Sequence, residues 1–345
     1  MKQERKTQEA HSYMEKAAML DRRAALTKTV GGLFALQGMG MSMAHAQPAN
    51  WPSRSIRMVI PQAPGGGIDI LGRLVAPRLT DVFNQPVVVE NKPGASANIG
   101  AADIAKAAPD GYSILYGINQ IVTFNPHIYP KLTYNPLTDL VPVTQTSTVG
   151  FILVVNNNLP VKSVKDLVEH AKKNPGKLNY GSWGAGSAHH IGMELFCGMG
   201  GVKITHVPYK QAPVTDLIGG NIDIQLEVPP SIRSFISEGK VRALAYTGAT
   251  RHPDFPDLPT VAETLPGYEL ISWHGVWLPK GASPELVERF NTEFVRIVKT
   301  PEINKKMAEF AFTPTGTTSA EFAQIIARDN KKWGQVIRDR DIKMD

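Results

Sequence analysis

Strand-like and helix-like segments alternate along most of this chain, and this alternation constrains its fold more than any other feature of the sequence. Short runs rich in β-branched residues and bounded by turn formers predict strands. Such runs span residues 55–60, 86–90, 112–117, 150–156, 177–182, 203–209 and 222–228. Segments with helical spacing of apolar residues or with capping signals cover residues 71–83, 98–108, 163–174, 189–199, 213–220, 282–300 and 318–339. Repeated β-then-α units predict an α/β protein with mostly parallel sheets and helices on both faces.

The length of the chain sets how many such units it holds. With 345 residues, the chain is long enough to form two α/β domains. Two series of units followed by terminal helices predict two lobes, and a ligand site is expected between them.

The N-terminal segment has the pattern of a cleavable export signal. Arg22 and Arg23 precede a short, small-residue-rich apolar stretch, "TVGGLFALQGMGMSMA", which ends in "AHAQ". Small side chains at Ala44 and Ala46 suit a signal peptidase, so residues 1–46 are predicted to be the signal and cleavage is expected after Ala46. The paired arginines leave the choice between general and twin-arginine export open.

Charge and cysteine content exclude some classes of protein. Removal of residues 1–46 takes away 7 Lys/Arg and 4 Asp/Glu, so the net charge of +6 becomes +3. This mildly basic body has no long Lys/Arg run, which argues against a nucleic-acid partner and fits attraction of small anions. The single cysteine, Cys197, cannot form an intramolecular disulfide, and its apolar neighbours indicate a buried thiol.

The stretch "IPQAPGGGIDILGRL", residues 60–74, places bare backbone at a strand-to-helix turn. Gly65, Gly66 and Gly67 let backbone N–H groups point inward, and the next helix is expected to begin at Ile68 or Asp69. Free N–H groups and the partial positive charge of a helix N-terminus attract anions. The stretch lacks the lysine of a phosphate loop and the glycine spacing of dinucleotide folds. A plain tight turn capped by Asp69 is the simpler alternative.

A second loop, "NYGSWGAGSAHH" at residues 179–190, has the same character. It follows a predicted strand, opens a predicted helix, and offers the hydroxyls of Ser182 and Ser187 together with the backbone N–H groups of Gly184 and Gly186. Two anion-seeking loops in different lobes predict a ligand held by both.

Two other chemistries remain open for this second loop. A hydrolase could use Ser187 with His190, but the G-x-S-x-G elbow is absent around Ser182 and Ser187. His190 and Glu194 lie four residues apart, with His189 adjacent, which is a metal-ligand spacing without an obvious third ligand. We therefore expect no catalytic residue, no metal and no cofactor.

Long stretches of the sequence carry a family resemblance, and they lie in residues 51–340. They read "WPSRSIRMVIPQAPGGGIDILGRL", "QPVVVENKPGASANIGAADIAKAAPDGYSILYG", "NPHIYPKLTYNPLTDLVPVT", "NPGKLNYGSWGAGSAHHIGMELF", "HVPYK", "TDLIGGNIDI", "LPTVAETLPGYELISWHGVWLP" and "INKKMAEFAFTPTGTTSAEF". In this order they resemble the Bug-type extracytoplasmic solute receptors, the substrate-binding proteins of tripartite tricarboxylate transporters.

The resemblance implies a two-lobed type II periplasmic binding protein, or Venus flytrap, with a cleft between the lobes. Residues 50–150 plus 276–345 would form one lobe and residues 151–275 the other. A ligand carboxylate would lie, with bridging waters, between two loops. These loops comprise Pro64, Gly65, Gly66, Gly67, Ile68 and Asp69 in the first lobe, and Ser182, Trp183, Gly184, Gly186, Ser187 and His190 in the second. By the same resemblance, Asn119, Tyr209 and Asp223 would line the cleft.

Asp69 is not expected to contact the ligand as the other loop residues do, because its carboxylate would repel a bound carboxylate. It is expected to cap its own helix or to orient waters, and thus to touch the ligand indirectly. Ile68 stands where the family usually has Thr or Ser, and Trp183 stands where a small residue is usual. These departures predict a more apolar cleft, and hence an aromatic or partly apolar carboxylate rather than citrate. The alternative for Trp183 is burial in the core of its lobe.

The resemblance also implies how the protein works in the cell. The chain is expected to be a periplasmic, monomeric receptor that delivers a small organic acid to the membrane permease subunits of a tripartite tricarboxylate transporter. A sensor that passes the ligand signal to another protein is the alternative.

Overall fold

The computed structural model describes residues 51–210 and 212–344. The predicted export signal therefore lies outside the described residues. Residues Pro52–Asp345 form one compact unit, which contains all the elements named below. Among the described residues, no helix combines the length and the apolarity that a bilayer span requires.

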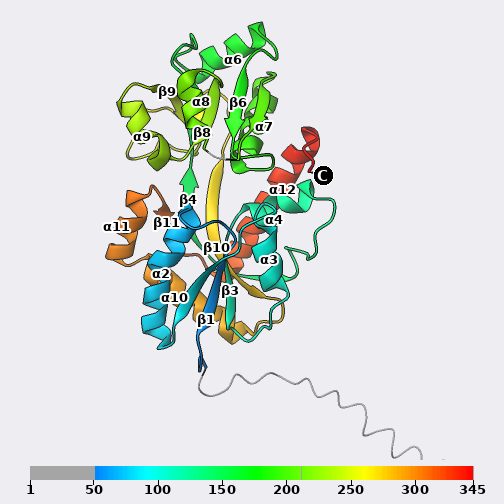
Figure 1. Cartoon of the computed structure of the whole chain (residues 1–345), viewed down its shortest axis with the longest axis vertical. Coiled ribbons are helices and arrows are strands. Elements are labelled where there is room, and N and C mark those ends of the chain that lie inside the picture. Colours follow the sequence, from blue (N-terminus) through cyan, green and yellow to red (C-terminus); the bar gives the residue numbers. More distant parts are fainter. Residues whose placement is uncertain (1–50, 211, 345) are drawn as a thin grey trace, which may run out of the picture. The chain divides into compact units, whose positions relative to one another are not determined.

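Two mixed β-sheets form the framework of this unit (Figure 1). The first has six strands, in the spatial order β11 (Thr313–Pro314), β4 (Leu140–Gly150), β10 (Ile271–Pro279), β3 (Ser113–Ile118), β1 (Ile56–Ile60) and β2 (Val87–Asn91). The second has five, in the order β7 (Thr205–Pro208), β6 (Asn179–Ser182), β8 (Ile224–Glu227), β5 (Ile152–Asn156) and β9 (Val241–Tyr246).

Helices connect and cover both sheets (Figure 1). Those attached to the first sheet are α2 (Gly67–Phe83), α3 (Asn98–Ala105), α4 (Gln120–Thr123), α5 (Asn125–Ile128), α10 (Pro284–Val298) and α11 (Pro301–Glu309). Those between the strands of the second sheet are α6 (Val164–Lys173), α7 (Ala188–Gly200), α8 (Val214–Gly219) and α9 (Pro229–Ser237), and the short 3-10 helix η1 (Val261–Glu263) follows β9. The last helix, α12 (Ser319–Asp339), packs against β4 and α4 and also against α7.

The sheets are not mostly parallel, which corrects the prediction from the sequence. β1 pairs in parallel with β2 and β3, and β6 pairs in parallel with β7 and β8, as β-then-α units require. In contrast, β10 runs antiparallel to β3 and β4, and β5 runs antiparallel to β8 and β9. These antiparallel pairs involve strands β4, β5, β9 and β10, which adjoin the two places where the chain passes between the sheets.

The chain passes from one sheet to the other in two places. Phe151 separates β4 in the first sheet from β5 in the second, and the chain returns between β9 and β10. The lobe ranges stated above stay a prediction. One predicted boundary, between residues 275 and 276, falls inside strand β10 and thus not at a passage between the sheets.

Apolar side chains from strands and helices form the cores around the sheets. Around the second sheet, Leu153, Val155 and Leu226 pack with Phe196 and the thiol-bearing Cys197, and all five are buried. This bears out the expected buried thiol, and burial raises the pKa of Cys197 to about 12. These packed cores hold the strand ends, and therefore the loops that follow them, in fixed positions.

Candidate functional site

The loop after β1 ends at a helix N-terminus that has no side-chain cap. Gly65 has a φ of +84°, which favours glycine, and Gly66 is the N-cap residue of α2. No side-chain hydrogen bond caps this helix, which begins at Gly67. The first N–H groups of a helix have no partner within the helix, so they are available to an anion here.

Asp69 fixes the conformation of this loop through hydrogen bonds. Its side chain is 4 % exposed, and it accepts hydrogen bonds from the N–H of Gly65 at 2.9 Å, from Arg73 Nε at 3.0 Å and from Asn91 Nδ2 at 2.9 Å. Burial alone would raise the pKa of Asp69, but these three donors outweigh it and hold the pKa below its ordinary value. Asp69 is therefore a fixed anion that shapes the loop.

The loop after β6 leads to a second helix N-terminus, which does have a side-chain cap. Gly184 and Gly186 have φ values of +101° and +76°. Ser187 caps α7, because its hydroxyl accepts the N–H of His190 at 3.3 Å and donates to the carbonyl oxygen of Gly184 at 2.7 Å. The N–H of His190 is thus occupied, whereas those of Ala188 and His189 in the same turn have no partner within the helix.

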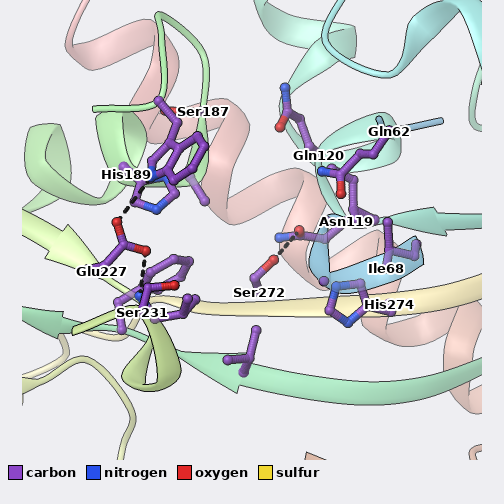
Figure 2. A pocket seen from close by; sticks show the side chains of 18 of the residues that line it. Gln62, Ile68, Asn119, Gln120, Ser187, His189, Glu227, Ser231, Ser272 and His274 are labelled. Carbon is purple, nitrogen blue, oxygen red and sulfur yellow. Dashed lines mark hydrogen bonds between the residues drawn. The ribbon is translucent and has the colours of Figure 1, made fainter. Parts of the chain in front are cut away.

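Both loops open on one cavity of about 480 Å³. Figure 2 shows Ser187, His189, Glu227 and Ser231 on one side of it and Gln62, Ile68, Asn119 and Gln120 on the other. The first group comes from the segments around the second sheet and the second group from those around the first. The cavity therefore lies between the two sheets.

Seven of the residues predicted from the sequence line this cavity: Gly65, Gly66, Gly67, Ile68, Asn119, Trp183 and Ser187. Trp183 is 45 % exposed, so its indole faces the cavity and not the core of its lobe. Eight do not line it: Pro64, Asp69, Ser182, Gly184, Gly186, His190, Tyr209 and Asp223. Six of these eight, all except Tyr209 and Asp223, are next to a lining residue in the sequence.

Ser182 and His190 support the second loop instead of facing the cavity. The Nδ1 atom of His190 accepts the N–H of Gly186 at 3.0 Å, and Ser182 Oγ is 2.6 Å from Nε2 of His206. The two imidazoles stack with ring centroids 3.9 Å apart. Burial lowers the pKa of both rings, that of His206 to about 4. Two neutral rings can stack in this way, and together they fix the loop.

Tyr209 and Asp223 lie outside the cavity for different reasons. The hydroxyl of Tyr209 donates at 2.6 Å to Asp216, which lies in the first turn of α8. Asp223 precedes β8 and accepts the N–H of Asn179 at 2.9 Å. Glu227 ends the same strand and lines the cavity. The resemblance thus pointed to the amino end of β8, whereas the cavity lies at its carboxyl end.

Thirteen lining residues were not predicted as ligand-binding: Gln62, Ile118, Gln120, Val149, Phe151, Ala188, His189, Glu227, Val228, Ser231, Ser272, His274 and Phe312. Some follow parallel strands, and the rule that the carboxyl ends of such strands meet at one edge would have found them. Gln62 follows β1, Gln120 follows β3 and Val228 follows β8. Ser272 and His274 lie within β10, which carries no such signal.

Asn119 offers the cavity a hydrogen-bond donor. Its side chain is 1 % exposed, and its Oδ1 accepts a hydrogen bond from Ser272 at 2.9 Å. Its Nδ2 group is buried and has no hydrogen-bond partner among the described residues. Because a buried unpaired N–H is costly, this group is well placed to donate to a ligand.

Two histidines in the cavity are neutral at physiological pH. Burial lowers the pKa of His189 to about 3 and that of His274 to about 4. His274 shares a hydrogen bond with Ser147 at 2.9 Å, whereas neither ring nitrogen of His189 has a partner in the described part of the chain. A neutral imidazole has one donor and one acceptor nitrogen, so His189 can bind either kind of ligand group.

The alternative chemistries receive no support from the geometry. The Ser187 hydroxyl and the His190 ring each bond to backbone groups of the loop, and no hydrogen bond between them is found in the described ranges. Glu194 accepts hydrogen bonds from Tyr180 and Arg340, at 2.8 and 2.7 Å. Residues 51–210 and 212–344 contain no group of three or more His, Cys, Asp or Glu side chains arranged to hold a metal.

Two α/β sheets with a cavity between them, onto which two helix N-termini open, define a two-lobed solute-binding protein. The family model described as "Tripartite tricarboxylate transporter family receptor" matches residues 71–342. The chain belongs to this family of receptors.

Individual relatives agree with this assignment. Protein BugT of Bordetella pertussis is 33 % identical over 298 residues, which are 85 % of this chain and 91 % of BugT. The solved structure of R. palustris Rpa4515 with adipate has a TM-score of 0.77 and 36 % identity, covering 85 % of this chain and 100 % of that one. The structure of the periplasmic binding protein BugD has a TM-score of 0.73 and 29 % identity, covering 85 % and 100 %. The predicted Bug-type two-lobed fold is thus confirmed.

Proposed function

We propose that this protein is an extracytoplasmic receptor that captures a small organic carboxylate between its two lobes. One observation carries the proposal: the uncapped N-terminus of α2 and the Ser187-capped N-terminus of α7 open on the same cavity of about 480 Å³. Each helix N-terminus favours a negative charge. A carboxylate between them would receive N–H donors from both sides of the cavity.

The side chains around the cavity support the same ligand class. The unpaired Nδ2 group of Asn119 and the neutral ring of His189 add donors without adding a full charge. A few hydrogen bonds to a charged group in a water-poor site are enough for micromolar affinity, which corresponds to about 8 kcal/mol. The related Rpa4515 structure is one with adipate, a carboxylate, and this likeness adds further support.

The cavity also has aromatic and apolar surface. Trp183, Phe151 and Ile68 line it together with Phe312. This surface supports the preference, predicted from the sequence, for a partly apolar or aromatic acid over citrate.

Family membership supports the cellular role. The receptor would be periplasmic and monomeric, exported by residues 1–46, and would pass its ligand to the permease subunits of a tripartite tricarboxylate transporter. The periplasmic location named for the related BugD agrees with this proposal.

Thermal unfolding with a panel of acids tests the proposal. The chain beginning at residue 47 is unfolded in denaturant and refolded, so that any trapped ligand is lost. It is then heated with mono-, di- and tricarboxylates. An acid present at 100 times its dissociation constant should add about 2.7 kcal/mol, which for a protein of this size raises the Tm by roughly 5 to 10 °C. If no acid shifts the Tm of protein that refolds fully, the proposal is wrong.

A further inference from the structure

Glu227 adds an acidic group to a cavity whose helix N-termini attract anions. It is the last residue of β8, its side chain is 3 % exposed, and it lines the cavity (Figure 2). The ion pairs found in the described part of the chain do not include Glu227. An acidic group in a receptor for carboxylates calls for a physical explanation, because it repels the expected ligand.

The contacts of Glu227 show which form of the carboxyl group the protein is built to hold. Its Oε2 atom accepts hydrogen bonds from Nε1 of Trp183 at 3.1 Å and from Nε2 of Gln225 at 2.8 Å. Its Oε1 atom accepts the N–H of Val228 at 3.0 Å. All three partners are donors, and no acceptor for a carboxyl proton is found among the described residues, so the contacts within the protein suit the ionised form. Burial raises the pKa of Glu227 above its ordinary value, and these donors offset that shift only in part, so a cationic partner is needed to hold the group ionised.

One acceptor position of Glu227, a residue that lines the cavity, has no donor among the described residues. An ionised carboxylate has about four lone-pair positions, and three are occupied here. The open position needs a donor, and none of the described residues supplies one. A ligand with an N–H group is the natural partner.

The charge balance of the cavity leads to the same conclusion. Among the described residues, the lining includes no Lys and no Arg, and Glu227 is its only acidic residue. The lining histidines, His189 and His274, are neutral because burial lowers their pKa. The two helix N-termini suit one carboxylate, but a second or third carboxylate would meet the charge of Glu227 without a compensating cation.

We propose that the ligand is a zwitterion, with a carboxylate at the helix N-termini and an ammonium group that donates to Glu227. This inference rests on the proposed function and specifies its ligand class as amino acids, either α-amino acids or longer chains with a terminal amine. The indole of Trp183 and the ring of Phe151 line the same cavity and provide surface for the chain between the two charged groups.

Calorimetric titration of matched ligands tests the proposal. For each length from three to seven carbons, the purified and refolded protein is titrated with the simple acid, the terminal amino acid and the diacid. The α-amino acids are tested in the same way. At the length that fits, the amino acid should bind at least about tenfold more tightly than both partners of the same length.

The variant Glu227→Gln separates the two proposals. It should weaken binding of the amino acid at least about tenfold and bring its affinity close to that of the simple acid. Glu309→Gln, which makes the same change at an exposed residue at the end of α11, should change nothing. If diacids bind best to the wild-type protein, the zwitterion is excluded and the carboxylate receptor stands. If none of these ligands binds while another acid raises the Tm in the thermal-unfolding panel, the zwitterion is excluded and the carboxylate receptor stands; if no acid binds in either experiment, both proposals fail. The comparison of ligands on the wild-type protein holds even if Glu227→Gln does not fold.

Discussion

The indole Nε1 of Trp183 donates a hydrogen bond to Oε2 of Glu227 at 3.1 Å, and the two residues lie 44 positions apart in the sequence. The contact ties the loop between β6 and α7 to the carboxyl end of β8. Because both side chains line the cavity, it also fixes the direction of the acidic group there. The loop that supplies one helix N-terminus is thus coupled to the group proposed to select the ligand.

Replacing Trp183 by Phe should lower stability in a way that depends on pH. The substitution keeps an aromatic ring but removes one donor from the Glu227 carboxylate, which costs about 1 kcal/mol at this half-exposed indole. Removing this donor raises the pKa of Glu227 further. A raised native pKa favours the protonated native state, so the cost is present at pH 7, shrinks as the pH falls through the raised native pKa values, and is largely gone near the unfolded value of about 4.5.

Urea unfolding of wild type and Trp183→Phe at pH 7 and pH 4 measures this difference. In a Glu227→Gln background the same substitution should cost little at either pH, because no carboxylate remains to be stabilised. An equal cost in both backgrounds would mean that the indole acts through packing alone.

Replacing Gly65 by Ala should weaken both folding and ligand binding. The φ of Gly65 is +84°, and a side chain in the left-handed region costs roughly 1 to 2 kcal/mol. A Cβ at this position meets no atom within 4 Å, so the cost arises from the backbone and not from a clash. Relaxation of this strain moves the N–H groups at the start of α2, and we expect ligand affinity to fall about tenfold.

Gly239 supplies a matched control for Gly65. It has a φ of +66°, a Cβ at this position would also lie in open space, and the residue lies between α9 and β9, away from the cavity lining. Gly239→Ala should therefore lose similar stability with unchanged affinity. Thermal unfolding and calorimetric titration of both variants make the comparison. Equal loss of affinity in both variants would mean that the start of α2 does not bind the ligand.

Replacing Asn119 by Asp should abolish most ligand binding while the fold survives. The side chain keeps its shape and can still accept the hydrogen bond from Ser272. The unpaired Nδ2 donor is lost, and a negative charge takes its place in the cavity. Loss of a bond to a charged group together with like-charge repulsion should cost about 2 to 3 kcal/mol, or roughly 30- to 150-fold in affinity.

Calorimetric titration of Asn119→Asp against the best ligand measures this loss. Asn304→Asp, an exposed change of the same charge in α11, should bind as the wild type does. Unchanged affinity in Asn119→Asp would show that the amide nitrogen does not meet the ligand.

The local parts of this fold could be predicted from the sequence. Strands β1, β2, β3 and β5 are short apolar runs, and their predicted positions are confirmed within two residues. The free N–H groups expected at the two loops follow from the glycines within each loop, although α2 begins at Gly67, one residue before the predicted start, and the capping role of Ser187 was not predicted. The two loops that open on the cavity were predictable for this reason.

Strand β4 could not be predicted, because its pattern is not apolar. Thr144, Thr146 and Ser147 are fully buried, yet they are polar. Their hydroxyls bond to Thr317 and to the backbone and ring of His274, which lie far away in the sequence. Glu227 and Ser272 join the site for a similar reason, since their partners are 44 and 153 positions away. Tertiary contacts of this kind leave no local pattern.

The buried histidines predict how stability depends on pH. Burial lowers the native pKa of His206 and His274 to about 4 and that of His189 to about 3, whereas an unfolded histidine has a pKa of about 6.5. As the pH falls below 6.5, the unfolded chain binds protons that the native protein does not, so unfolding becomes easier. Each such histidine lowers the free energy of unfolding by up to about 1.4 kcal/mol per pH unit in this window. Urea unfolding between pH 7 and pH 5 measures the slope above the range where carboxylates titrate. His206→Asn should reduce that slope by the contribution of one proton, and a flat profile over this range would contradict the neutral, buried state of these rings.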